Sequence, residues 1–539
     1  MKKNIILTAI VLLFFYNWSN TALAYAIFTK TPGDYSKSVV TSSSTLWVPD
    51  NYTTIQEAID HAKEGETIFI RAGTYHEHVI VNKALSLFGE NKYDTIIDGS
   101  KSGHVAIVTA NNVAISNVTI QNGDFGIWLL NSRDSILTDN IFTNNTHGID
   151  LYGSSNNILS GNFISNNYDG IYLFRSSGNT LSDNFASNNY DGIHLDHSGN
   201  NLLSGSTVSN NTYGIYIHDS DNNVLCGNNA LQNQCGIFFY YSSSNVASGN
   251  TIANNSQQRV FLDSSNNNEI FHNNFLNEIG SLRSVNSENS WDNSVEGNYW
   301  GDYAGSDANR DGIGDTPYPI GEENQDNYPL MAMFFQFNAL VENRSYIINA
   351  VSDSTISDFR CYSDLENRNN SVGFKVNGAG FCRISIPNAL IEPPFTVRVN
   401  SSQSSYFKQV YASGTHTWLY FDFASSENEV RIMQMFPTEQ LMWYQRAIFG
   451  LAIIIAILFP ICIHYYRLFN KQKEVVEAYE REVGSFPVSH EERVRMRFVK
   501  DVIEREEKIE KFKRKYGIKI QPASTLEDLM KRLGVQKER

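Results

Sequence analysis

The chain has 539 residues, a formal net charge of −15 at pH 7 and five cysteines. This length exceeds what a single hydrophobic core usually holds, so several domains are expected. The acidic balance excludes nucleic acid as the main partner and is compatible with bound cations. So few cysteines exclude a fold that depends on disulfides.

Both ends of the chain carry targeting patterns. The first 24 residues combine a basic start, an apolar run and a small-residue cleavage motif, as a secretory signal peptide does. A second apolar run covers 447–466, long enough to cross the hydrocarbon core of a bilayer as a helix. The segment 467–539 carries a net charge of +5, which leaves −20 for the rest of the chain. These patterns predict a single-pass protein of the cytoplasmic membrane, with its N-terminal domains extracellular and its tail cytoplasmic.

A short capped helix is expected at the start of the extracellular part. Thr54 and Glu57 have the spacing of a capping box, and an amphipathic segment follows them. Alternating apolar residues then predict strands over 67–71, 78–81 and 85–89. A helix in this position would cover the open end of the first coil of a repeat structure.

A period of 22 residues governs the middle of the chain. Short apolar runs alternate with turns rich in Asn, Asp, Gly and Ser, which predicts stacked coils of parallel strands, a β-helix. A recurring asparagine is expected in turns, in left-handed geometry and bonded to its equivalent in the next coil. The period is set by the glycines at Gly126, Gly148, Gly170, Gly192, Gly214 and Gly236, and the asparagines are Asn140, Asn162, Asn184, Asn228 and Asn250.

Three phrases carry a family resemblance: "VPDNYTTIQEAIDHAKEGETIFIRAGTYHEHVIV", the "NNYDGIYL" coils and the closing "GNYWGDYAGSDANRDGIGDTPYPI". The segment 45–332 resembles the NosD-like, pectin-lyase-like right-handed parallel β-helix proteins, whose repeats are also named for carbohydrate binding and sugar hydrolysis. Many of these relatives look like archaeal surface proteins, here in a membrane-anchored form. The resemblance implies the fold, whereas proteins of this fold include lyases, hydrolases, adhesins and copper-maturation factors.

Two stripes of outward-facing residues are expected on one sheet, on rungs about 4.8 Å apart. Aromatic rings in such stripes offer flat apolar faces to sugars, and interleaved polar groups hydrogen-bond hydroxyls. An alternative is that β-propensity alone places the aromatic residues there. The stripes predict carbohydrate binding through Trp128, Tyr152, Tyr172, Phe174, Tyr216, His218, Phe238 and Tyr240.

Catalysis on the same face is a second hypothesis. Asp169 and Asp191 lie one rung apart, with His194 and Asp196 nearby in sequence. Such residues could act as acid, base or metal ligands in a polysaccharide lyase or glycoside hydrolase. The alternative is a repeated Asp-Gly turn without chemistry. A lyase also needs a basic residue here, for which Arg175 is the candidate.

Two metals come into consideration. The segment 307–315 places oxygen donors at alternate positions, as in the first half of a calcium loop, although Tyr318 occupies the place of the final glutamate. Copper is the weaker alternative, through imidazoles on neighbouring coils. The expected calcium ligands are Asp307, Asn309, Asp311, Ile313 by its carbonyl and Asp315, with Asp326 as a completing ligand; the copper candidates are His147, His194, His197 and His218.

The repeat stops before residue 333. Short alternating strands over 333–440 predict a small β-sandwich, in which Cys361 and Cys382 are the expected disulfide pair. The tail 467–539 is charged and is expected to form helices, with an apolar stripe that could bind a cytoplasmic protein partner. The sequence therefore predicts a cell-surface carbohydrate-binding protein, with an enzyme, a structural or adhesive envelope protein and a NosD-type copper-handling protein as the alternatives.

Overall fold

A computed structural model gives the fold of most of the chain before the predicted membrane span. The predicted signal peptide 1–24, the predicted membrane span 447–466 and nearly all of the tail lie outside the described residues. Within the part that the structure does describe, no helix is both long and apolar enough for a membrane span. The described residues are 45–276, 281–321, 324–364, 369–400, 402–403, 407–424, 427–435 and the single positions 501, 504, 508 and 511.

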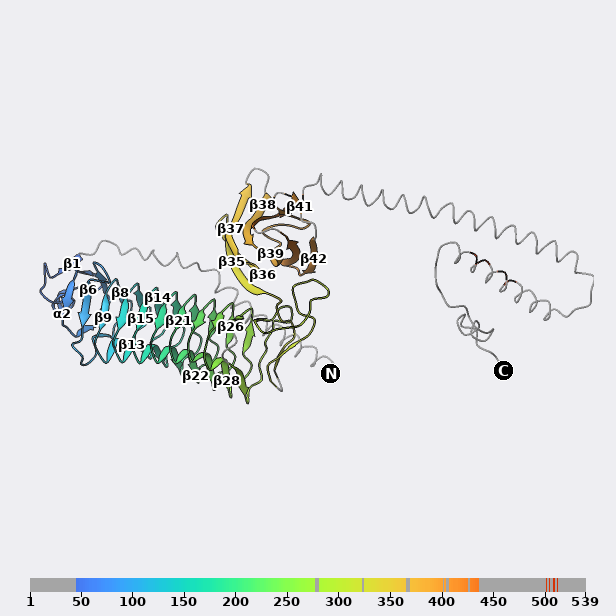
Figure 1. Cartoon of the computed structure of the whole chain (residues 1–539). Helices are drawn as coiled ribbons and strands as arrows, with labels where there is room; N and C mark the ends of the chain where they lie inside the picture. Colours follow the sequence, from blue (N-terminus) through green and yellow to red (C-terminus); the bar gives the residue numbers. More distant parts are fainter. Residues whose placement is uncertain are drawn as a thin grey trace, which may run out of the picture. The chain divides into compact units, whose positions relative to one another are not determined.

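Parallel strands wind into a β-helix whose successive coils each add one strand to three sheets, called sheets A, B and C (Figure 1). The crossovers follow the right-handed sense that parallel strands prefer. Sheet A consists, in spatial order, of β1 (Thr45–Val48), β2 (Thr67–Ile70), β5 (Ser86–Gly89), β8 (Ala114–Ser116), β11 (Ile136–Thr138), β14 (Ile158–Ser160), β17 (Thr180–Ser182), β20 (Leu202–Ser204), β23 (Val224–Cys226), β26 (Val246–Ser248) and β29 (Glu269–Phe271).

Sheets B and C complete each coil. Sheet B consists of β3 (Gly73–Tyr75), β6 (Thr95–Asp98), β9 (Thr119–Gln121), β12 (Ile141–Thr143), β15 (Phe163–Ser165), β18 (Phe185–Ser187), β21 (Thr207–Ser209), β24 (Asn229–Leu231), β27 (Thr251–Ala253), β30 (Asn274–Leu276) and β32 (Tyr299–Trp300). Sheet C, which has the longest strands, consists of β4 (Val79–Val81), β7 (Ala106–Val108), β10 (Phe125–Leu130), β13 (His147–Tyr152), β16 (Asp169–Phe174), β19 (Asp191–Asp196), β22 (Tyr213–His218), β25 (Cys235–Tyr240), β28 (Gln258–Asp263) and β31 (Ser281–Val285).

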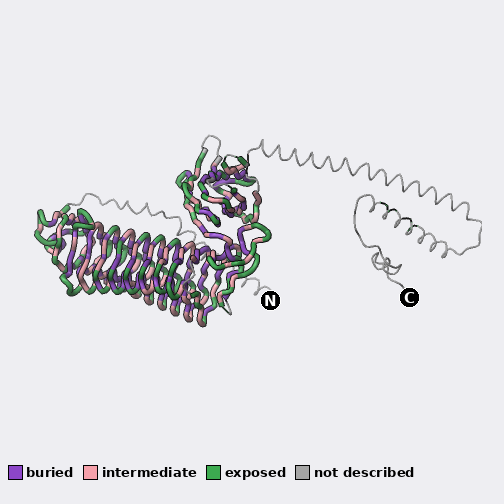
Figure 2. Tube along the Cα trace, in the orientation of Figure 1, coloured by how far each residue is buried: buried purple, intermediate pink, exposed green. Residues whose placement is uncertain are grey.

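The 22-residue period sets the register between coils, as predicted. Ile149 pairs with Ile171, and Ile171 pairs with Ile193. These side chains are buried in the interior of the coils, whereas exposed residues gather at the turns (Figure 2). Stacked apolar ladders of this kind make one continuous core along the β-helix.

Asparagine ladders reinforce the turns. The Asn140 side chain donates to the Asn162 carbonyl Oδ1 over 3.2 Å, and Asn162 donates likewise to Asn184 over 3.0 Å. The predicted bond to the next coil is therefore confirmed. The predicted left-handed geometry is wrong for these asparagines, since the preceding residues Asp139 and Gly161 take the positive φ. That arrangement turns the amide inward, where it bonds buried backbone groups.

The capping helix is present as predicted. Helix α2 (Ile55–His61) begins after Thr54, whose side chain accepts a hydrogen bond from the Glu57 N–H. The Glu57 carboxylate reaches back to the Thr53 N–H, one residue earlier than in a standard capping box. Ile55 and Ile59 are fully buried in the core of the β-helix.

A β-sandwich follows the last coil and a short hairpin, β33 (Tyr318–Pro319) and β34 (Gln325–Asp326). Its antiparallel strands confirm the predicted sandwich. Its first sheet consists of β35 (Met333–Val341), β36 (Arg344–Ser352), β39 (Gly380–Pro387), β43 (His416–Phe423) and β42 (Phe407–Ala412). The second consists of β37 (Ile356–Asp364), β38 (Asn369–Asn377), β44 (Glu427–Gln434), β40 (Phe395–Val399) and β41 (Ser402–Gln403).

The expected disulfide between Cys361 and Cys382 is wrong. Both are free thiols, in strands β37 and β39 of different sheets. Cys226 and Cys235 are also free, and burial raises the pKa of both thiols to about 12. The described part of the chain is thus held by packing and hydrogen bonds.

A buried ion pair connects the β-helix cap to the sandwich. The Arg383 guanidinium lies 2.6 Å from Glu296, and His272 lies 3.0 Å from the same carboxylate. Burial opposes ionisation of Glu296, but these two neighbours outweigh it and lower its pKa to about 2. Arg383 also donates to the Asp311 carbonyl over 2.7 Å, so a single side chain contacts two segments of the cap.

Candidate functional site

Glycines allow a second outward-facing residue on six long strands of sheet C, from β10 to β25, whereas β28 has Arg259 at this position. A Cβ atom at Gly170 would lie 2.5 Å from the carbonyl oxygen of Gly192, so only glycine fits between successive rungs there. The strand alternation breaks at this position. As a result, the residue before the glycine and the residue two after it lie on the same outer face: Asp191 contacts His194 at 3.1 Å.

The residues two after each glycine form one continuous row, in the register that the sequence predicts. Phe261, which pairs with Phe238, continues this row, here called the central row. Rings follow one another along the β-helix axis. His194 and Tyr216 have ring centroids 4.5 Å apart, and Tyr216 and Phe238 lie 5.0 Å apart with an interplanar angle of 6°. The central row contains Trp128, Asp150, Tyr172, His194, Tyr216, Phe238 and Phe261.

Stacking changes what this row offers to a ligand. Phe238 has Tyr216 over one face and Phe261 over the other, the latter at 4.6 Å. The guanidinium of Arg283 lies 4.9 Å from the Phe261 ring. Because neighbouring rungs cover the faces of these rings, their edges form the outer surface. Sugar stacking on Tyr216 and Phe238 thus stays a prediction. A ligand on this face would meet only the ring edges and the Tyr216 hydroxyl.

Acidic and imidazole side chains gather on the three neighbouring strands β13, β16 and β19, and two of them, Asp150 and His194, interrupt the aromatic row. Asp169 pairs with Asp191 across adjacent rungs, as predicted. His147 Nδ1 lies 3.1 Å from an Asp169 oxygen, and His194 Nδ1 lies at the same distance from Asp191. Both aspartates are buried, with 5% and 4% of the residue surface exposed. These four residues form the group that we call the acid–imidazole cluster.

Burial shifts the ionisation of the carboxyls in this region. The pKa of Asp191 is raised, first by burial and then by the nearby charge of Asp169, against the opposing effect of His194. Burial, with a contribution from Asp169, raises the pKa of Asp150 to about 7, although His147 opposes the shift. A carboxyl with such a pKa exchanges protons near neutral pH, so Asp150 is suited to acid–base chemistry.

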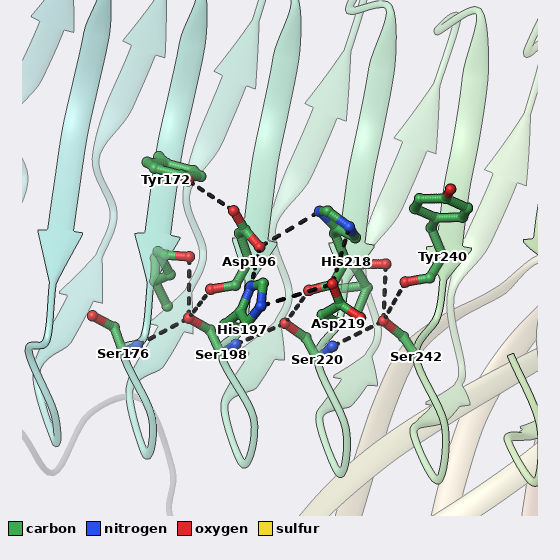
Figure 3. A network of polar contacts seen from close by, with 12 residues as sticks. Tyr172, Ser176, Asp196, His197, Ser198, His218, Asp219, Ser220, Tyr240 and Ser242 are labelled. Atoms are coloured by element: carbon green, nitrogen blue, oxygen red, sulfur yellow. Dashed lines mark hydrogen bonds and ion pairs between the residues drawn. The ribbon is translucent and has the colours of Figure 1, made fainter. Parts of the chain in front are cut away.

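Asp196 belongs to a different group. Its carboxylate accepts a hydrogen bond from the Tyr172 hydroxyl over 3.0 Å and lies 3.5 Å from His218 (Figure 3). His197 and Asp219 extend this edge network, which Figure 3 shows beside the buried serine ladder of the turns. The proposed catalytic residues therefore fall into two groups. Asp169, Asp191 and His194 lie together, whereas Asp196 belongs to the edge network with His197 and His218.

The copper candidates divide in the same way. Tyr172 lies between His147 and His194, with ring centroids 5.5 and 5.0 Å away. His197 and His218 contact the carboxylates of the edge network instead. Among the described residues, the His/Cys/Asp/Glu group compact enough for one ion contains His194 together with Asp169 and Asp191. The structure does not bring the four imidazoles together.

Two exposed tyrosines went unassigned in the sequence analysis. Tyr168 and Tyr190 directly precede Asp169 and Asp191, and their rings stack at 4.8 Å with an interplanar angle of 4°. They are 55% and 42% exposed, more than any residue of the central row. The signal was present in the repeated phrase "NNYDG", which places a tyrosine beside each aspartate.

The predicted calcium loop forms a compact turn. Asp307 accepts hydrogen bonds from the N–H groups of Asp311 and Gly312, and Asp315 accepts one from the Ala308 N–H over 2.7 Å. Asp326 is directed elsewhere, since it accepts from the buried Trp300 indole over 2.8 Å. Calcium binding by this loop stays a prediction, without Asp326 among its ligands.

Basic residues of the sandwich hold the same loop. Lys408 donates to the Asn309 carbonyl, Arg383 donates to the Asp311 carbonyl, and Arg310 of the loop pairs with Asp422. These contacts give the loop a structural role in joining the β-helix cap to the sandwich.

Comparison with known proteins assigns the β-helix. The family model described as "Periplasmic copper-binding protein (NosD)" matches residues 59–234 and 198–305. The β-helix of this chain is thus NosD-like, as its repeats predict. The chain is also 35% identical to a protein named "Cell surface glycoprotein" from Methanothermus fervidus, over 96 residues. That match spans 17% of this chain and only 16% of the glycoprotein.

Solved structures with a similar chain path include enzymes that act on polysaccharides. One is the A-module of the Azotobacter vinelandii mannuronan C-5 epimerase AlgE6, at 16% identity and a TM-score of 0.36, covering 46% of this chain and 87% of the module. Another is pectate lyase Pel9A, at 16% identity and a TM-score of 0.34, covering 50% of this chain and 83% of the lyase.

Proposed function

We propose that this chain is a cell-surface protein that binds extracellular carbohydrate on the outer face of sheet C. The predicted signal peptide and membrane span support a surface location, and so does the likeness to a protein named as a cell surface glycoprotein. The observation that carries the binding proposal is the exposed stacked pair of Tyr168 and Tyr190 beside the acid–imidazole cluster.

The end of this short stack is the best place for a sugar ring. The rung before Tyr168 carries Thr146, whose carbonyl accepts the Tyr168 N–H over 2.9 Å. A threonine leaves the adjoining face of the Tyr168 ring without an aromatic neighbour, whereas the other face is covered by Tyr190. The partly exposed His147 lies in the next position of the chain and can hydrogen-bond a hydroxyl.

The test is binding of neutral and uronic-acid oligosaccharides to the purified protein, measured by isothermal titration calorimetry. Tyr168→Ala should weaken binding about fivefold or more, because stacking on an aromatic face contributes roughly 1 kcal/mol beyond area burial. Tyr93→Ala is the matched control, since Tyr93 is 70% exposed on a loop before β6. Equal affinities for both variants and the wild type would contradict the proposal.

A second function, polysaccharide cleavage on the same face, rests on Asp150. Its pKa of about 7 suits a proton donor or acceptor at neutral pH. If this function is correct, mass spectrometry of polysaccharides incubated with the protein should show shortened products. Asp150→Asn should abolish these products. If no substrate gives shortened products with the wild type, the function is ruled out for the substrates tested.

A further inference from the structure

The acid–imidazole cluster has polar atoms that the protein does not satisfy. Asp169 Oδ1, Asp191 Oδ1 and His194 Nε2 are buried and have no hydrogen-bond partner among the described residues. Leaving such an atom without a partner costs about 1–3 kcal/mol, and more for a charged group. Two inaccessible carboxylates and an imidazole with free positions therefore point to a ligand that binds between them.

The same three residues are close enough together to hold one metal ion. One donor atom from each of Asp169, Asp191 and His194 can be chosen so that all three lie within 4.8 Å of one another. The three residues come from the neighbouring strands β16 and β19, whose register is fixed by the core on the other side of the sheet. A doubly charged cation would also neutralise the two carboxylates.

The kind of donor restricts the kind of metal. Calcium and magnesium take oxygen ligands, whereas an imidazole beside carboxylates is typical of zinc and related divalent transition metals. His147 Nδ1 lies 3.1 Å from the second oxygen of Asp169, so a protonated His147 would form an ion pair with that carboxylate. We propose that Asp169, Asp191 and His194 bind one divalent transition-metal ion of the zinc class. This proposal does not depend on carbohydrate binding.

Isothermal titration of the metal-stripped full-length protein with Zn²⁺ alone tests the site, and elemental analysis of the dialysed protein gives the stoichiometry. We expect one tightly bound Zn²⁺ per chain that excess Ca²⁺ does not displace. Asp191→Asn and His194→Phe should each weaken binding more than about 100-fold, since removing even an outer partner of a ligand costs 10–100-fold. His194→Phe keeps a ring to pack against Tyr216.

The edge network provides the matched control. Asp196→Asn combined with His218→Phe removes an acid and an imidazole from the same face while leaving the proposed ligands intact. This variant should bind Zn²⁺ like the wild type, and the urea midpoint of every variant reports whether it is folded. The proposal is overturned if the folded wild type binds no Zn²⁺, if Ca²⁺ displaces it, or if only the control variant loses binding.

Discussion

Replacing Asn162 by alanine should destabilise the β-helix strongly, because this one amide serves two neighbouring coils. Its Oδ1 accepts from the backbone N–H and the side chain of Asn140, at 3.1 and 3.2 Å. Its Nδ2 donates to the Leu137 carbonyl at 2.8 Å and to Asn184 at 3.0 Å. Asn162 is 1% exposed, so water cannot replace these four partners.

The expected loss follows from the bonds that would be broken. Each net hydrogen bond contributes about 1 kcal/mol, and a buried group left without a partner costs about 1–3 kcal/mol. For Asn162→Ala we therefore expect a decrease of about 3–5 kcal/mol in the free energy of unfolding. Urea unfolding followed by far-UV circular dichroism measures it, as a lower midpoint at unchanged slope.

A serine at the same position is the matched control, because the ladder already contains one. Ser206 occupies the equivalent place on another coil, where its hydroxyl accepts the Asn184 N–H over 3.2 Å. Asn162→Ser should keep this bond and cost roughly half as much as alanine. A loss under about 1 kcal/mol for alanine, or equal losses for both variants, would refute the assignment of stability to the amide ladder.

Two further predictions concern the packing of coils and the buried ion pair. Gly170→Ala should destabilise the protein by about 1–3 kcal/mol, since its Cβ would lie 2.5 Å from a carbonyl oxygen, whereas Gly414→Ala, with no atom within 4 Å, should have little effect on thermal unfolding. Arg383→Met should cost about 3–5 kcal/mol, because it leaves Glu296 charged and buried without its main partner. The pKa of Glu296 is lowered from 4.5 to about 2, so ionised Glu296 stabilises the fold fully above pH 4.5, and this stabilisation is lost as the pH falls toward 2. The free energy of unfolding of the wild type, measured between about pH 5 and pH 2, should show this loss. A free energy that stays constant across that range would contradict the prediction.

The fold was predictable because the repeat specifies it many times over. The spacing of the glycines fixes the register between successive strands. The register then determines which residues are neighbours, as in the pairing of Asp169 with Asp191. The capping helix was predictable for a different reason, since Thr54 and Glu57 form a local motif. In both cases the structure depends on spacing along the chain, which the sequence shows directly.

The environment of each side chain was not predictable in this way. The sequence places Tyr216 and Phe238 outward but does not show that stacked neighbours cover their faces. Nor does it show that Asp150, two residues after a glycine like the aromatic residues, is 4% exposed beneath its surroundings. Exposure and pKa depend on the side chains of adjacent coils taken together, and the period alone does not specify them.

The candidate site lies where polar residues replace the aromatic residues that would stabilise the central row. A row made entirely of aromatic rings would bury apolar surface at every rung, as Tyr216, Phe238 and Phe261 do. Asp150 and His194 interrupt that row, and the buried carboxyl at Asp150 is costly enough to raise its pKa to about 7. Buried polar groups without full hydrogen bonding are expected at functional positions, because structure alone favours apolar replacements there. The interruption of the ladder is thus an independent reason to test the proposed sites on strands β13, β16 and β19 first.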